Sequence, residues 1–212
     1  MIQLTRAELA VDPLVAARRL LGCVLVADVP GADEAVAVRL VEVEAYRGPD
    51  DPASHCYRGR TDRNTVMFGP AGHLYVYFVY GMHFCANVVA LTDGQPGAVL
   101  LRAGEVIDGL DMAWLRRPAS RSAAELARGP ARLTSVLGLD RSANGIDLTD
   151  PSSPVRLYAG DPVADVRTGP RVGVAMAMEV PWRYWVAGSP AVSTYRRGGK
   201  RRVVISDNMS RE

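Results

Sequence analysis

The chain has 212 residues, of which 48% are hydrophobic and 23% are charged, and its formal net charge is +2. These values are typical of one globular domain that is long enough to fold around its own core, and they exclude a disordered or low-complexity chain. No apolar run approaches the ~20 residues that a membrane helix needs, so we expect no membrane partner.

The cysteines and the first residues bear on the cellular compartment. Cys23, Cys56 and Cys85 are an odd set without a CxxC spacing, which indicates free thiols in a reducing environment. Residues 1–6 do not begin a charged segment followed by an apolar one, as a secretory signal would. We therefore expect a cytoplasmic protein.

The N-terminal part is predicted to hold one helix and two strands. Asp12-Pro13 has the pattern of a helix N-cap followed by proline at the first helical position, and Gly22 is expected to close that helix. A strand is expected at residues 23–29 and a longer one at residues 35–46.

The longer strand carries a defect in its alternation. Its apolar positions change face at Leu40-Val41, and a one-residue shift of this kind predicts a β-bulge. Bulges often redirect side chains beside active sites. After the shift, Glu42, Glu44 and Tyr46 share one face.

The rest of the chain is predicted to be one continuous α+β fold. Asp51-Pro52 is expected to start a short helix that carries His55, and a loop rich in glycine and arginine follows at residues 58–72. Further strands are expected at residues 73–80, 84–91, 98–104, 155–158, 171–176 and 184–186, and helices after Ser122 (with a Glu125 capping box) and from Gly129-Pro130 to Gly138.

No repeat or long linker divides the sequence. We expect a single compact mixed domain over residues 1–195, with a curved antiparallel sheet, surrounding helices and a protruding β-hairpin. The basic tail at residues 196–212 is expected to be flexible.

Glu42 and Glu44 are the first candidates for catalytic residues. An ordinary strand with one wet face would explain both, but glutamate is depleted in strands, and these two alternate just past a face switch. A carboxylate held beside a water molecule can serve as a general base.

The hairpin at residues 73–91 is crowded with aromatic side chains. One face carries Tyr75 and Tyr77, and a buried hairpin core explains Leu74, Val76 and Phe78 on the other. Tyr80 differs because it falls at the turn, where a ring is poorly placed to fill a core. It is well placed to push between base pairs as a wedge.

Arginine provides almost all of the positive charge, and Lys200 is the only lysine. Arginine suits phosphate recognition, although a GC-rich genome explains the bias equally well. Near the hairpin, Arg60 and Arg63 would suit a DNA backbone, whereas the arginines of the tail are expected to be solvated. A bifunctional lyase would need an amine for a Schiff base, and Lys200 is the sole candidate side chain.

Taken together, these segments resemble the alkyladenine (3-methyladenine) DNA glycosylase family, as a bacterial member, from about residue 12 to about residue 195. The most specific motifs are Val41-Glu42-Val43-Glu44-Ala45-Tyr46 with Gly48-Pro49, and Leu74-Tyr75-Val76-Tyr77-Phe78-Val79-Tyr80-Gly81-Met82. Their order and spacing carry the match, and shorter motifs support it at residues 87, 99–103, 129–133, 171–174 and 188–190.

The resemblance implies a role for each matching position. Glu44 falls at the catalytic glutamate, Arg102 lies beside the catalytic water, and Asn87 discriminates against the amino group of normal guanine. Rings that would sandwich the flipped base are Tyr46, His55 and Tyr77, and Tyr80 would fill the gap left in the stack. Contacts to the DNA backbone would come from Met82, Arg60, Arg63 and Arg132.

The resemblance also implies the reaction. The expected partner is double-stranded DNA with damaged purines of the 3-methyladenine, 7-methylguanine, hypoxanthine and ethenoadenine class. Their N-glycosidic bond would be hydrolysed without lyase activity and without cofactors, by a protein that is expected to be a monomer and to associate with the nucleoid through DNA. Two alternatives remain: a non-catalytic nucleic-acid-binding module, and a metal hydrolase that uses Glu44, His55, His73, His83 and Cys56.

Overall fold

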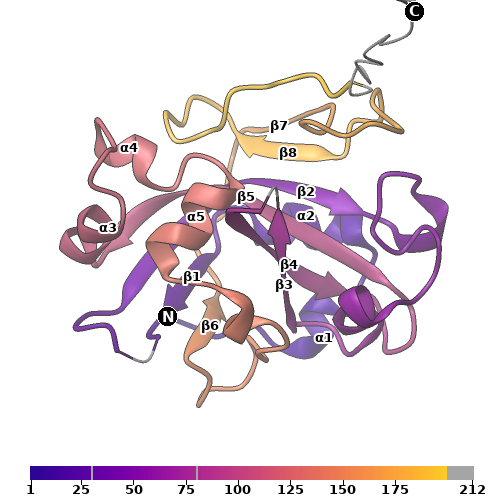
Figure 1. Cartoon of the computed structure of the whole chain (residues 1–212), viewed down its shortest axis with the longest axis horizontal. Coiled ribbons are helices and arrows are strands. Elements are labelled where there is room, and N and C mark those ends of the chain that lie inside the picture. Colours follow the sequence, from indigo (N-terminus) through magenta and orange to yellow (C-terminus); the bar gives the residue numbers. More distant parts are fainter. Residues whose placement is uncertain (30, 80, 200–212) are drawn as a thin grey trace, which may run out of the picture.

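One antiparallel sheet organises the molecule (Figure 1). The computed structural model describes residues 1–29, 31–79 and 81–199, and these are the residues discussed below. The sheet runs in the order β3-β4-β5-β2-β1-β6, and β8 pairs with both β2 and β7. The strands are β1 (Val24–Ala27), β2 (Val36–Tyr46), β3 (Leu74–Val79), β4 (His83–Ala90), β5 (Gly97–Asp108), β6 (Val155–Tyr158), β7 (Val166–Gly169) and β8 (Arg183–Val186).

Short helices cover this curved, half-barrel sheet. The α-helices are α1 (Arg6–Leu9), α2 (Pro13–Leu20), α3 (Leu110–Arg116), α4 (Ala123–Leu126) and α5 (Pro130–Leu137). Three 3-10 helices are η1 (Gly48–Asp50), η2 (Asp62–Phe68) and η3 (Arg141–Ala143). Helix α2 packs on β2, helix α5 packs on β4 and β5, and buried side chains from both helices share one main core with the sheet. The expected α+β class and curved antiparallel sheet are therefore confirmed. None of the described helices combines the length and hydrophobicity that a membrane crossing requires.

The predicted change of face in β2 is confirmed. Its pairing with β5 shifts between Leu40 and Glu42, which leaves Val41 without a partner in the ladder. Leu40 before the shift and Val43 after it both point into the main core, whereas Val41 joins a small separate cluster. The shift thus keeps the apolar side of β2 buried while Glu42 and Glu44 point to the other face.

Local signals predicted several boundaries correctly. The Asp12 carboxylate accepts a hydrogen bond from Leu14 N at 2.8 Å, with Pro13 as the first residue of α2. Helix α5 follows Gly129 and ends at Gly138, whose φ of 68° is the left-handed conformation that glycine adopts without strain. The hairpin of β3 and β4 is also confirmed.

Four local predictions were wrong. No helix starts at Asp51. Its side chain accepts the backbone N–H of Ala53, and the residues that follow form turns instead of a helix. Ser122 makes no cap hydrogen bond, although α4 begins after it. Residues 171–176 are not a strand, and the strand beside β8 is instead β7, which the sequence patterns did not reveal. Phe78 is 41% exposed rather than buried in the hairpin core, and it packs on Phe84.

Two predictions fall on residues that are not described. The wedge assigned to Tyr80 lies outside the described residues, and so do residues 200–212 of the tail, which include Lys200. Residues 58–72 contain the 3-10 helix η2 rather than a wholly irregular loop.

Candidate active site

Strand β2 holds Glu44 in a fully buried position on the face away from the main core. Its Oε1 accepts the backbone N–H of Val172 at 2.7 Å, and its Oε2 accepts the hydroxyl of Tyr46 at 2.9 Å. The Nε atom of Arg102 lies 3.4 Å from Oε1. A carboxylate has about four acceptor positions, so these contacts leave capacity for a further donor such as water.

The surroundings of Glu44 tune its basicity. Burial raises the pKa of Glu44 above its ordinary value, and this effect outweighs the opposing influence of Arg102, the Val172 N–H and the Tyr46 hydroxyl. Burial and the Glu44 charge likewise raise the pKa of Tyr46 well above its usual range, so its hydroxyl stays protonated and donates. The site therefore holds one carboxylate whose proton affinity is raised toward neutral pH, as a general base requires.

Glu42 is a second fully buried carboxylate, and it organises Arg102. Its Oε1 accepts Arg102 Nε at 3.1 Å and the Ser193 hydroxyl at 2.9 Å, and its Oε2 accepts Ser193 N at 2.7 Å. Arg183 NH1 lies 3.5 Å from Glu42 Oε1. Arg102 Nε thus lies near both carboxylates, and Glu42 together with the Ser193 hydroxyl holds the guanidinium beside Glu44.

The predicted base-stacking rings lie close together. The His55 and Tyr77 ring centroids are 4.5 Å apart at 75°, and Tyr75 stacks on Tyr77 at 5.3 Å. Tyr75 also bonds His55 Nδ1 through its hydroxyl at 3.1 Å, and Asn87 Nδ2 donates to the Tyr75 carbonyl at 3.2 Å. Partial burial and the Arg63 charge lower the pKa of His55, so its ring is neutral at pH 7.

These side chains line two connected spaces. A small pocket of about 40 Å³ is enclosed by Tyr46, His55, Met67, Tyr75, Tyr77 and Asn87. It has room for about one water molecule. A wider groove of about 460 Å³ is lined by Tyr46, His55, Tyr77, Arg102 and the Val172–Val174 segment, among others. Glu44 lies directly beneath this groove, since its three polar partners Tyr46, Arg102 and Val172 form part of the lining.

Comparisons with known proteins agree with this geometry. Residues 7–190 match the family model described as methylpurine-DNA glycosylase. The chain belongs to the methylpurine-DNA glycosylase family.

Close relatives of this glycosylase can be aligned with nearly its whole chain. A Nocardia farcinica protein is 56% identical over 197 residues, which is 90% of each chain. A Mycobacterium tuberculosis protein is 51% identical over 198 residues, covering 91% of this chain and 94% of its own. A Streptomyces avermitilis protein is 51% identical over 203 residues, or 94% of each chain. All three carry the name "Putative 3-methyladenine DNA glycosylase". The family resemblance is thus confirmed, and the protein is a DNA repair hydrolase whose substrate is DNA.

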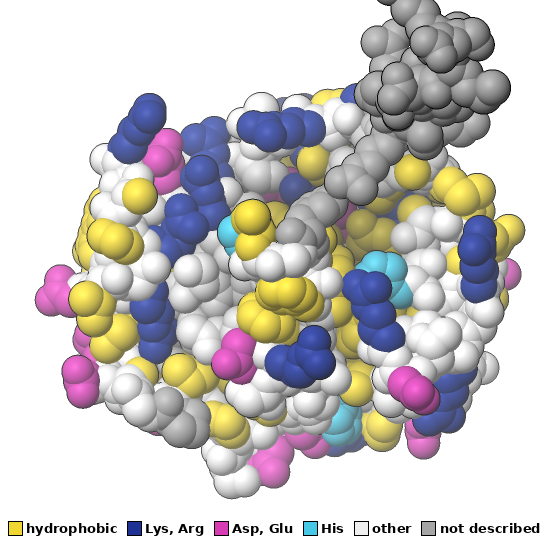
Figure 2. Space-filling view, in the orientation of Figure 1, with side chains coloured by type: hydrophobic (Ala, Val, Ile, Leu, Met, Phe, Trp, Pro, Cys, Tyr) yellow, Lys and Arg dark blue, Asp and Glu magenta, His cyan; other side chains and the backbone are white. Residues whose placement is uncertain are grey.

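Positive charge surrounds the groove of the glycosylase. Figure 2 shows arginine side chains spread over the face that carries the hairpin, with acidic side chains mainly toward its edges. Arg63 lines the groove, with its guanidinium carbon 5.6 Å from the Tyr77 ring centroid. Arg60 and Met82 are exposed, and Met82 is among the most exposed apolar side chains at 68%. Arg132 lies on α5 and contacts the Glu125 carbonyl at 3.5 Å, so it is outside the groove lining.

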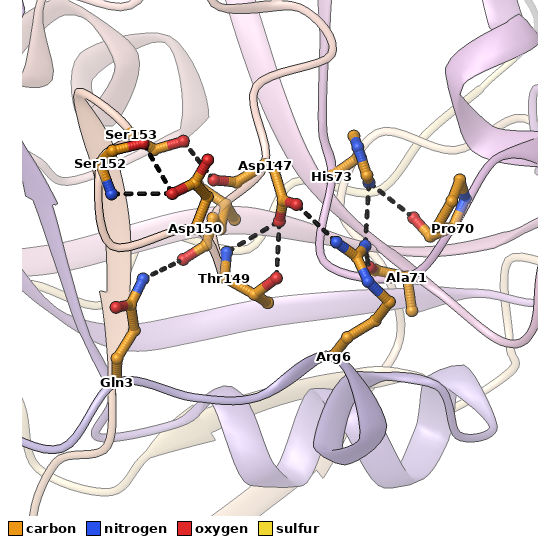
Figure 3. Close-up of polar contacts among 11 residues, drawn as sticks. Gln3, Arg6, Pro70, Ala71, His73, Asp147, Thr149, Asp150, Ser152 and Ser153 are labelled. Carbon is orange, nitrogen blue, oxygen red and sulfur yellow. Dashed lines mark hydrogen bonds and ion pairs between the residues drawn. The ribbon is translucent and has the colours of Figure 1, made fainter.

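The histidines invoked for a metal site do not converge. His73 lies instead in a polar network where its Nδ1 is 3.0 Å from the Pro70 carbonyl and 3.3 Å from Arg6 NH1 (Figure 3). Cys56 packs with its sulfur 3.5 Å from that of Met67. In the described parts of the chain, no three His, Cys, Asp or Glu side chains are arranged to hold a metal ion.

Several residues that shape the site were not predicted from the sequence. Tyr75 and Met67 line the small pocket, Ser193 binds Glu42, and Val172 binds Glu44. Tyr75 had a usable signal, because it shares a strand face with Tyr77. Val172 binds through its backbone N–H, which leaves no mark on the side-chain pattern, and Ser193, which binds through its backbone N–H and its hydroxyl, lies far along the chain from Glu42.

Proposed function

We propose that this glycosylase flips alkylated or deaminated purines out of duplex DNA and hydrolyses their N-glycosidic bond with one water molecule activated by Glu44. The proposed substrates are 3-methyladenine, 7-methylguanine, hypoxanthine and ethenoadenine. One observation carries the proposal: a buried carboxylate with a raised pKa lies directly beneath an open groove lined by aromatic rings.

Stacking would support extrusion of the nucleotide. Flipping costs a few kcal/mol, and least for a damaged or mispaired base. Each base–aromatic stack is worth about 1–3 kcal/mol, so Tyr46, His55 and Tyr77 would offset that cost. The purine would enter through the wide groove and stack against Tyr46, His55 and Tyr77, which line both this groove and the small pocket that contains Asn87. The wedge role of Tyr80 is part of this proposal.

The ring cage suits a cationic base. Alkylation at purine N3 or N7 gives the base a positive charge, and such a cation is attracted to the faces of aromatic rings. His55 would not repel it, because the pKa of its imidazole is lowered by partial burial and by Arg63, so the ring is neutral. Damaged bases would thus be favoured over normal ones before any bond breaks.

One carboxylate would suffice for the chemistry. O-glycosidases need a second carboxyl group to protonate the leaving oxygen, but a cationic purine already leaves easily. Glu44 would accept a proton from water while the water oxygen bonds to the anomeric sugar carbon. The electrons of the broken C–N bond would pass to the purine, so a cationic alkylated base would leave as a neutral molecule, whereas a neutral base such as hypoxanthine would have to gain a proton in order to leave. The Glu44 charge would also stabilise the positive charge that develops on the sugar, with Arg102 keeping the carboxylate oriented.

Asn87 would restrict the choice of base. It is buried, lines the pocket behind the rings, and has its Nδ2 committed to the Tyr75 carbonyl. Because this bond fixes the amide, we expect it to leave no room for the extra 2-amino group of guanine. Normal guanine would therefore be rejected by steric conflict.

The absence of lyase activity belongs to the same proposal. A lyase forms a Schiff base through an amine, and Lys200 is the only lysine of the chain. The product strand should therefore remain intact until it is treated with alkali. Release of an unmodified abasic site would separate this reaction from that of a bifunctional enzyme.

The proposal is tested by base release from a panel of duplexes, each with one of the four lesions, in the presence of a chelator. Strands cut only after alkali would support it. Binding without release from any lesion would favour the non-catalytic module, and activity that chelation abolishes would favour the metal hydrolase. Activity on undamaged DNA at a similar rate would contradict the proposed role of the ring cage.

A further inference from the structure

A buried ion pair between Asp51 and Arg171 lies behind the proposed catalytic carboxylate. Arg171 NH1 and NH2 donate to the two Asp51 oxygens at 2.5 and 2.8 Å, and the exposed fraction of both side chains is 0%. Only arginine offers this planar, two-pronged geometry, since lysine is a point charge. Neither residue was among those predicted for the site.

Arg171 contacts the structures that surround Glu44. Its NH1 donates to the Ala45 carbonyl at 3.0 Å, and its guanidinium carbon lies 4.6 Å from the Tyr46 ring centroid. The next residue, Val172, supplies the N–H that binds Glu44 Oε1 at 2.7 Å. The placement of Arg171 therefore fixes the strand next to Glu44, the ring that donates to it, and the backbone group that orients it.

Asp51 extends the same contact to the turn that carries His55. Its Oδ1 accepts Ala53 N at 3.0 Å, and its Oδ2 accepts Arg47 N at 3.3 Å. The ion pair thus joins the His55 turn to the Val172–Val174 segment, and both of these line the groove. Two walls of the groove are held together by one pair of side chains.

We propose that Arg171, held by Asp51, is a positioning residue that sets the orientation and the basicity of Glu44. This inference rests on the proposed function, because it takes Glu44 as the general base. Removing two charges from water is costly, so a buried ion pair is weak evidence for stability alone. An apolar side chain could not hold the surrounding groups in a fixed geometry, so a positioning role accounts for an arginine at this position.

The basicity of Glu44 gives a readout that a purely structural role would not move. The Val172 N–H bond lowers the pKa of Glu44, so loss of that bond should raise this pKa further. A lysine at position 171 keeps the positive charge but cannot make the planar, two-pronged contact that arginine makes. The other titratable groups that face Glu44 stay in place, namely Glu42, Tyr46, Tyr77, Cys85, Arg102 and Arg183.

The test compares R171K and D51N with the wild type and with a control, R6K. Arg6 also pairs with an aspartate and a backbone carbonyl, Asp147 and Ala71, each at 2.5 Å, but in the network of Figure 3 away from the groove. Single-turnover base release from a hypoxanthine duplex is measured across pH, together with thermal unfolding and affinity for the same duplex. D51N disrupts the same ion pair from its other side, and the unfolding temperatures identify which variants are folded.

We expect R171K to release base about 10- to 100-fold more slowly than the wild type, because small misplacements of catalytic groups have effects of this size. The acidic limb of its pH–rate profile should move to higher pH, and D51N should move it in the same direction. R6K should match the wild type in both. Affinity for the lesion duplex should change little.

An unchanged rate, or an acidic limb that stays in place or moves to lower pH in the folded variants, would overturn the inference alone. If the wild type and R6K release no base from any lesion, the proposed function fails first. The two failures are thus distinguishable in one experiment.

Discussion

Replacing Glu44 with glutamine should slow base release by orders of magnitude while the fold and DNA binding persist. The amide has nearly the shape of the carboxylate, and its oxygen can still accept the Val172 N–H, which is 2.7 Å from Oε1. It cannot accept a proton from water at neutral pH. A positioned general base contributes about 10²- to 10⁴-fold, so we expect a loss within that range in single-turnover release.

Stability gives an independent expectation for the same variant. The pKa of Glu44 is raised in the folded chain, so the folded state binds more protons than the unfolded state between the ordinary and the raised pKa. The stability of the wild type therefore falls as the pH rises through that interval, and ionised Glu44 disfavours the fold at neutral pH. E44Q should consequently unfold at the same temperature as the wild type at pH 7, or at a higher one.

The assay uses duplexes with one hypoxanthine, followed by alkali and a sizing gel, with gel-shift affinity and thermal unfolding in parallel. A suitable control is E105Q, because Glu105 pairs with Arg39 and Ser189 outside the groove lining. Release by E44Q at the wild-type rate would refute Glu44 as the base. A sharply lower unfolding temperature at pH 7 would refute the argument from its raised pKa.

The remaining predictions concern DNA binding. Y80S should weaken affinity for a lesion duplex without lowering the unfolding temperature, and an unchanged affinity in a gel shift would count against the wedge. Binding should weaken with salt with a log–log slope of about −0.9 per phosphate contacted. R63A should reduce the magnitude of that slope by about 0.9, the value of one phosphate contact, because Arg63 is exposed at the edge of the groove. An identical slope would show that Arg63 touches no phosphate.

Strand β2 explains why part of the site could be predicted from the sequence. The face switch at Leu40-Val41 is visible as a break in alternation, and it indicated correctly that Glu42, Glu44 and Tyr46 leave the core together. The matching irregularity on β5 was not predicted. There the pairing moves from Ala103 to Leu101, which leaves Arg102 without a ladder partner opposite the glutamates.

The missed contacts share a physical reason. Val172 and Ser193 bind the two glutamates across 128 and 151 positions of sequence separation, Val172 through its backbone N–H and Ser193 through its backbone N–H and its hydroxyl. Residues 171–176 were predicted as a strand because their pattern is β-prone, but the Arg171 side chain is withdrawn into the interior by Asp51. Tertiary pairing of this kind overrides local propensity.

The same electrostatics predict that E42Q shifts the basicity of Glu44 in the direction opposite to R171K. The Glu42 charge raises the pKa of Glu44, so its removal should lower this pKa and move the acidic limb of the pH–rate profile to lower pH. Arg102 would remain close to Glu44, because Nε is 3.4 Å from Oε1 and NH2 still donates to the Ser193 hydroxyl at 3.2 Å.

Because Glu42 is the carboxylate that hydrogen-bonds the buried Arg102, at 3.1 Å, its loss should also lower the free energy of unfolding, by up to about 3–5 kcal/mol, which thermal melts would detect. A weaker base is a slower one, so the plateau rate should fall as well. An acidic limb that moved upward in E42Q would mean that Glu42 acts on Glu44 by holding Arg102 in place rather than through its own charge, and the electrostatic account of the two carboxylates would be wrong.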